Sequence, residues 1–151
     1  MLTDDLIAPL AAWSPWLPFD DAALSAPRLP GVYLAREGAE GELAYVGMAG
    51  ERRGQGLRGR LTVYRRGKAA VSGLGEAVLD RALADPAFVR QHLNELVAGR
   101  PKRAAAWAQD ALRRAELYVR WAVTADRATA ATLERAVLDA LAASPLWNRA
   151  R

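Results

Sequence analysis

Two charged side chains fall on the apolar faces of predicted helices, where hydrophobic side chains are expected. A helix over about 55–66 turns Arg60 toward its apolar side, and a helix over about 126–143 turns Glu134 between its leucines, because 3.6 residues complete one turn. A carboxylate that faces a protein interior needs a pairing partner or a metal ion. This periodicity alone fits an internal Arg60–Glu134 ion pair, since structural ion pairs also occupy such positions, and it leaves a functional site as the alternative.

Two tyrosines flank one predicted hairpin. An expected strand over 32–36 carries Tyr33 near its start, and a second expected strand over 42–46 carries Tyr45 near its end. The connection between the strands holds two glycines, which is typical of a longer hairpin loop. Each tyrosine stands close to a further glycine that an ordinary hairpin does not need, so the pair is either part of the core or part of a site.

The rest of the chain predicts helices and one more strand. Residues 116–123 are rich in β-branched and aromatic side chains, which favours a third strand. Asp126 suits the N-cap of the last helix, which Pro145 ends. We therefore expect an α/β fold, with a small three-stranded antiparallel sheet flanked by helices and a helical insertion over about 73–115 before the third strand. The helices expected in the insertion cover 74–84, 86–98 and 102–115.

A tryptophan- and proline-rich segment precedes the hairpin. Residues 1–30 contain repeated prolines, which interrupt both helices and strand ladders. We expect an ordered N-terminal arm that packs on the core through its aromatic side chains. At 151 residues, the chain is expected to form a single domain over 1–151.

The composition excludes several classes of chemistry. The chain has no cysteine, which removes disulfides, thiolate metal sites and cysteine nucleophiles. No run approaches the roughly 18 apolar residues that span a bilayer, and the N-terminus lacks the basic stretch of a signal peptide. We therefore expect a cytoplasmic protein without membrane contact.

Positive charge is concentrated in one stretch. Residues 50–70 hold seven Lys and Arg against one Glu, a net charge of +6, whereas the whole chain carries +4. Such a local patch is typical of proteins that bind polyanions. Arginines on an ordinary solvated face produce the same pattern.

The motifs together resemble the GIY-YIG nuclease superfamily. Gly31-Val32-Tyr33 matches the first tripeptide of this family, and Tyr45-Val46-Gly47 matches the second at the right separation. The resemblance covers residues 30–66 and 116–148 and leaves out the arm and the helical insertion. The other residues that match the family pattern are Arg60, Tyr64, Glu134 and Asn148.

The resemblance implies a divalent-metal DNA endonuclease that uses Mg²⁺ or Mn²⁺. Glu134 is then the metal ligand, since magnesium is often held by one or two carboxylates. Arg60 stabilises charge on the phosphoryl group, Tyr33 activates or positions the attacking water, and Tyr45 orients the phosphate or a water. Tyr64 is a supporting phenol.

The remaining site residues have binding or supporting roles. Asn148 fixes a neighbouring segment or the active-site network, and Gly47 leaves space for the substrate. The DNA-binding residues expected from the basic stretch are Arg58, Arg65, Arg66 and Lys68.

Three questions stay open at this level. Some family members carry a lysine directly after the second tripeptide, where this chain has Met48. A nuclease-like module that binds DNA or a protein without efficient turnover is the alternative function, and the protein is either a monomer or a homodimer.

The sole histidine, His92, is expected to pack near Phe88, Leu93 and Leu96 as a satisfied polar group.

Overall fold

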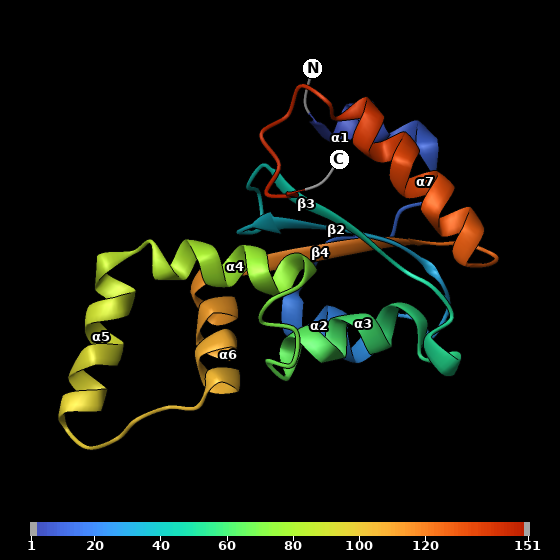
Figure 1. Ribbon diagram of the computed structural model, residues 1–151. Coiled ribbons are helices and arrows are strands. Elements are labelled where there is room, and N and C mark those ends of the chain that lie inside the picture. Colours follow the sequence, from blue (N-terminus) through green and yellow to red (C-terminus); the bar gives the residue numbers. More distant parts are fainter. Residues whose placement is uncertain (1–2, 150–151) are drawn as a thin grey trace. The chain divides into compact units, whose positions relative to one another are not determined.

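The computed structural model describes residues 3–149, which form two compact units. The first unit combines the chain up to residue 62 with the chain from residue 116 onward, and the second unit covers residues 63–115. The expected α/β fold is confirmed: the described residues contain seven α-helices and one open antiparallel sheet of four strands. Figure 1 labels the helices and the longer strands.

The sheet has the strand order β1-β4-β2-β3. The long strands are β2 (Gly31–Glu37), β3 (Leu43–Ala49) and β4 (Leu117–Val123). The sequence predicted three strands; a fourth, β1 (Leu17–Pro18), comes from the N-terminal arm and pairs with β4. Only two residues long, β1 lacks the alternating pattern that reveals a strand in a sequence.

Both hairpin strands are longer than expected because they include the glycines of the two tripeptides. In the register of the sheet, Tyr33 on the central strand β2 lies between Gly47 of β3 and Trp121 of β4. A register shift between Ala35 and Arg36 marks a bulge near the hairpin turn. β3 is an edge strand, so its outer backbone groups are open to other segments.

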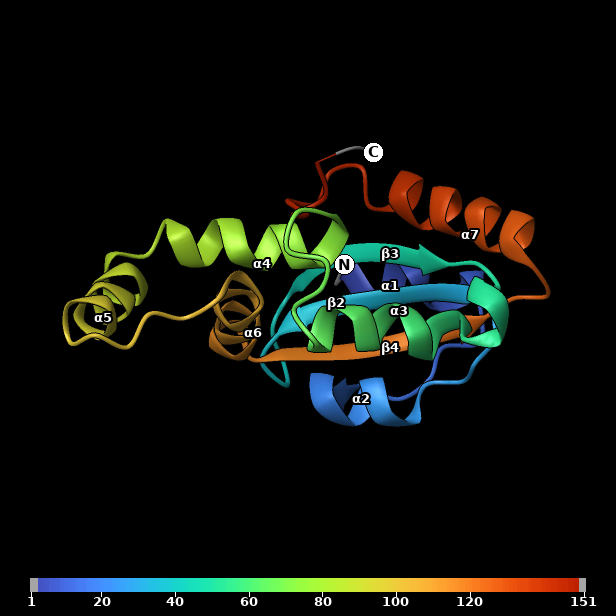
Figure 2. The same ribbon diagram turned by 60° about the horizontal axis from the view of Figure 1, so that its bottom comes forward.

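Helices cover both faces of the sheet (Figures 1 and 2). On the face that we call the α3 face, α2 (Phe19–Ser25) and α3 (Gly56–Arg65) pack against the strands. Side chains alternate along β2, and Gly31 lies against Leu57 of α3. Tyr33, two residues on, therefore faces α3 as well.

On the opposite face, the α7 face, α7 (Arg127–Ala140) and α1 (Thr3–Ile7) cover the strands. Val32 and Leu34 of β2 pack there with Val137 and other side chains of α7. Trp13 and Trp16 of the arm pack against the same cluster, as the sequence predicted. A 3₁₀ turn, η1 (Ala8–Leu10), follows α1.

The first and last predicted helices of the sheet unit are confirmed within a few residues. α3 begins one residue later than expected, after the 3₁₀ turn η2 (Arg52–Gly54). α7 begins after Asp126, whose carboxylate accepts a hydrogen bond from the Thr129 N–H at 2.8 Å. α7 ends at Ala140, three residues before the predicted limit.

The second unit consists of three helices that match the predicted insertion. They are α4 (Gly73–Leu83), α5 (Pro86–Val97) and α6 (Ala104–Ala115). Asp85 caps α5 by accepting a hydrogen bond from the Ala87 N–H at 3.0 Å. Within residues 3–149, no helix has the length and apolar composition needed to cross a membrane.

Candidate active site

The two hairpin tyrosines stack on each other on the α3 face. The ring centroids of Tyr33 and Tyr45 are 6.3 Å apart and the ring planes differ by 25°. Tyr33 is only 1% exposed, whereas Tyr45 is half-buried. The structure therefore brings these two phenols together and leaves Tyr45 more accessible to solvent.

Gly47 makes this arrangement possible. A Cβ atom at Gly47 would lie 2.2 Å from Cζ and 2.3 Å from Oη of Tyr33, far inside van der Waals contact. The phenol of Tyr33 thus reaches across β2 to lie over the backbone of β3. The sequence predicted that the lack of a side chain at Gly47 leaves space for the substrate. In the structure, the ring of Tyr33 occupies that space.

Asn148 holds the outer edge of β3 beside Tyr45. Its Oδ1 accepts a hydrogen bond from the Val46 N–H at 3.1 Å, and its Nδ2 donates to the Val46 carbonyl at 2.7 Å. The Trp147 N–H donates to the Ala44 carbonyl at 2.6 Å. This C-terminal segment fixes the backbone on either side of Tyr45, so Asn148 is a positioning residue, in agreement with one of the two predicted roles.

Arg58 and Arg60 lie within one turn of α3, and both are half-buried. Arg58 Nε donates to the Ala26 carbonyl at 2.7 Å and so ties α3 to the end of α2. That hydrogen bond gives Arg58 a structural role which its predicted contact with DNA did not include.

Glu134 is half-buried on α7, the helix that packs against β2 and β3. Burial raises the pKa of its carboxyl above the ordinary value, and the neighbouring Arg135 only partly offsets this effect. Within residues 3–149, no hydrogen bond or ion pair reaches the Glu134 carboxylate. Among the residues that the structure describes, Arg135 thus gives the half-buried carboxyl of Glu134 only partial charge compensation, without a direct contact.

The internal ion pair that the sequence left open is not formed. In the described part of the chain, no ion pair within 4.0 Å joins Arg60 to Glu134. The two side chains belong to helices on opposite faces of the sheet (Figure 2). An explanation of the charge at Glu134 as half of a structural ion pair with Arg60 is therefore wrong.

The other predicted site residues lie in the second unit. Tyr64 is buried, and its hydroxyl accepts a hydrogen bond from the Leu74 N–H at 3.3 Å, at the start of α4. The carbonyl of Arg65 accepts a hydrogen bond from Gln109 Nε2 at 3.3 Å. The exposed side chains are those of Arg65, Arg66 and Lys68.

The donor set fits a magnesium-type ion better than a zinc-type ion. Among residues 3–149, no three His, Asp or Glu side chains gather closely enough to hold a metal, which a tetrahedral zinc site requires. Mg²⁺ instead keeps several waters and is commonly bound through one or two carboxylates and substrate phosphates. A single carboxylate such as that of Glu134 is compatible with a site of this kind.

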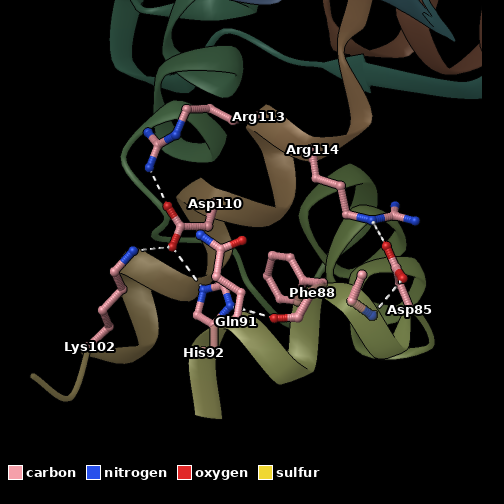
Figure 3. A pocket seen from close by; sticks show the side chains of 9 residues that line it. Asp85, Phe88, Gln91, His92, Lys102, Asp110, Arg113 and Arg114 are labelled. Atoms are coloured by element: carbon pink, nitrogen blue, oxygen red, sulfur yellow. Dashed lines mark hydrogen bonds and ion pairs between the residues drawn. The ribbon is translucent and has the colours of Figure 1, made fainter. Parts of the chain in front are cut away.

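His92 is a structural residue of the second unit (Figure 3). It is 4% exposed and contacts the rings of both Phe88 and Trp107, at centroid distances of 4.2 and 4.1 Å. Its Nδ1 is 2.8 Å from the Phe88 carbonyl and its Nε2 is 2.9 Å from Oδ2 of Asp110. The prediction of a satisfied polar group is confirmed.

The predicted neighbours Leu93 and Leu96 do not share the environment of His92. They are 52% and 56% exposed, so the expected apolar face of this helix is wrong. Asp110 is the partner that sequence reasoning missed, because it is 18 residues away and only the pairing of α5 with α6 brings it close.

Comparisons with known proteins add no assignment. No family model, no curated protein and no solved structure matches this chain.

Proposed function

We propose that this protein is a divalent-metal-dependent DNA endonuclease of the GIY-YIG type, which hydrolyses phosphodiester bonds. In this proposal β2, β3 and β4 with α3 and α7 form the GIY-YIG-like core. The strand β1 and the helices of residues 63–115 are additions to that core. DNA is the partner, and Mg²⁺ or Mn²⁺ is the cofactor.

The observation that carries the proposal is the only partly compensated carboxylate of Glu134. Partial burial disfavours its charged form, and the described residues offer it no hydrogen-bond donor. Its helix packs against β2 and β3 on the face of the sheet opposite to the two tyrosines. A divalent cation would supply the charge compensation that the described residues give only in part at this position.

Tyr33, Tyr45 and Asn148 each have a separate role in the proposed site. Tyr33, almost fully buried beneath Tyr45, positions the attacking water or accepts its proton. Tyr45 is more accessible and orients the phosphate. Asn148 fixes the edge of β3 on which Tyr45 sits, so it acts through the backbone rather than on the substrate.

Two residues would stabilise the negative charge on the phosphoryl group, one directly and one through a bound ion. Arg60 adds a guanidinium, whose fixed donors suit phosphate oxygens. Glu134 would hold the ion, and a bound Mg²⁺ or Mn²⁺ supplies Lewis-acid polarisation of the phosphate and stabilisation of the leaving oxygen. Arg60 and Glu134 thus act separately on the substrate rather than on each other.

Nicking of supercoiled plasmid in Mg²⁺ or Mn²⁺ tests the proposal. We expect wild-type protein to convert supercoiled DNA to the open circle. Glu134→Gln and Arg60→Ala should each reduce the rate about 100-fold or more, the usual effect of removing a group that stabilises transition-state charge. Asp139→Asn, an exposed carboxylate on the same helix as Glu134, is the matched control and should cut at the wild-type rate.

Two results would contradict the proposal. Equal cutting by wild type, Glu134→Gln and Arg60→Ala would point to a contaminating nuclease. Salt-dependent DNA binding by wild type without metal-dependent cutting would instead support a nuclease-like binding module.

A further inference from the structure

The second unit carries the positive charge of the protein. Residues 63–115 hold ten Lys and Arg against five Asp and Glu, a net charge of +5, so the remainder of the chain carries −1. The basic stretch recognised in the sequence contributes only three of these ten cations. The helical unit is therefore basic in its own right.

Several cations of this unit are already neutralised by carboxylates (Figure 3). Asp110 pairs with Lys102 at 2.7 Å and also with Arg113, while Arg114 Nε donates to Asp85 at 2.9 Å. These pairs bind α6 to α5 and to the segment before α6. The positive charges of these side chains are therefore balanced by carboxylates of the same unit.

A second group of donors, on α5 and in the segment just after it, is not used in this way. Arg90, Gln91, Asn94 and Arg100 line an open hollow of about 410 Å³ together with Ala87 and Glu95. In the described chain, neither Arg90 nor Arg100 forms an ion pair or a side-chain hydrogen bond. The one carboxylate of the hollow, Glu95, is paired with Lys102 at 3.4 Å.

The chemistry of the hollow favours a phosphate. Guanidinium groups match phosphate oxygens in a two-pronged geometry, and Gln and Asn amides are frequent donors to phosphates in protein–DNA contacts. Arg90 and Asn94 are four residues apart and so lie one above the other on α5. Both arginines are exposed, so a long polymer can reach them.

We propose that this hollow on α5 binds the phosphodiester backbone of DNA, as a contact separate from the cutting site. The inference rests on the proposed function for the identity of its partner. It assigns helices α4 to α6, which the GIY-YIG resemblance does not cover, the task of holding the substrate through sequence-independent phosphate contacts.

DNA binding as a function of salt tests this assignment in the Glu134→Gln background, which leaves the duplex uncut. We expect Arg90→Ala/Arg100→Ala to weaken binding on the order of tenfold at low salt and to reduce the slope of log K against log[salt] by about 2, one unit per lost contact. Arg28→Ala, an exposed arginine of the sheet unit, is the matched single-charge control. The single variants Arg90→Ala and Arg100→Ala should each reduce the slope by about 1.

The side-chain amides of Gln91 and Asn94 report binding directly in a proton–nitrogen NMR spectrum. A short duplex at micromolar concentration should shift both signals, and inorganic phosphate at the same concentration should not. If phosphate alone reproduces the shifts, the hollow binds single anions and the backbone assignment is wrong.

The inference is also overturned if the double variant binds DNA with the affinity and salt slope of Arg28→Ala. That result leaves the cleavage assay on wild type untouched. Conversely, loss of salt-dependent binding in the double variant together with an inactive wild type would retain the hollow and refute the nuclease.

Discussion

At the scale of single residues, Gly47 decides whether the tyrosine pair can form. Gly47→Ala places a methyl group about 2.2 Å from the ring of Tyr33, and rigid β-sheet backbone limits relaxation. We expect the free energy of unfolding to fall by about 2 kcal/mol, within the range for overpacked sites. Chemical denaturation measures this change, and plasmid nicking should fall with it because the ring of Tyr33 is displaced.

A double-mutant cycle isolates the contact between these two residues. Removing the ring with Tyr33→Ala should abolish most of the additional cost of Gly47→Ala. An equal cost of Gly47→Ala in the presence and in the absence of the ring would show that Tyr33 does not occupy the space above Gly47.

Glu134 illustrates a conflict between stability and the proposed function. Because burial raises the pKa of its carboxyl, the folded protein binds this proton more tightly than the unfolded chain. Stability is therefore lost as pH rises from the ordinary value of 4.5 through the raised value. At neutral pH we expect Glu134→Gln to stabilise the metal-free protein by less than about 1 kcal/mol, since solvent screens a half-buried side chain.

Thermal unfolding at several pH values measures this effect. The advantage of Glu134→Gln over wild type should shrink as the pH falls from the raised pKa toward 4.5 and should be absent below 4.5, and Asp139→Asn should show no such advantage. Adding Mg²⁺ should raise the melting temperature of wild type but not of Glu134→Gln. A variant that is less stable than wild type at neutral pH without metal would argue that Glu134 has a structural partner.

At the scale of elements, Asp110 joins α5 to α6. Burial alone would raise the pKa of its carboxyl, but hydrogen bonds from Lys102, His92 and Arg113 outweigh burial and lower it. Asp110→Asn should therefore destabilise the helical unit by about 2 kcal/mol, as expected for hydrogen bonds to a charged group. Hydrogen exchange of amides in α5 and α6 reports this local change.

The same lowered pKa sets the pH dependence of that contribution. It is fully present above the ordinary value of 3.8 and is lost as pH falls through the lowered pKa. Wild type and Asp110→Asn should thus converge only in strong acid. Asp80→Asn, an exposed carboxylate of α4, should leave exchange in α5 and α6 unchanged; an equal effect of both variants would contradict the role of Asp110.

The elements were largely predictable because they depend on local pattern. Hydrophobic periodicity located α3 to α7 within a few residues, and the cap at Asp126 is local chemistry. β1 and α2 were missed because they are short and acquire stability from pairing with β4. On α5, the sequence placed His92 near Leu93 and Leu96 and did not show its ring contact with Trp107, because that contact joins two different helices.

The candidate site was predictable in its members and less so in their contacts. The sequence identified the tyrosine pair and the inward-facing Glu134. It did not show that Gly47 accommodates Tyr33 or that Asn148 bonds to the backbone of Val46, 102 residues away. Contacts of that kind depend on strand register, which local periodicity does not specify.

At the scale of the whole molecule, chemistry and charge are divided between two units. The sheet unit holds Tyr33, Tyr45, Arg60, Glu134 and Asn148 and carries a net charge of −1, whereas the helical unit carries +5. This division fits a protein whose sheet unit cuts a polyanion and whose helical unit holds it. The central proposal is that the carboxylate of Glu134 binds a divalent cation.

A crystal structure with Mn²⁺, located by its anomalous scattering, tests metal binding at Glu134 directly. We expect one Mn²⁺ bound to the carboxylate of Glu134, with waters completing its coordination, and no ion at this position in Glu134→Gln. Wild-type crystals that hold Mn²⁺ elsewhere and none at Glu134, from protein that cuts DNA in the same buffer, would contradict it.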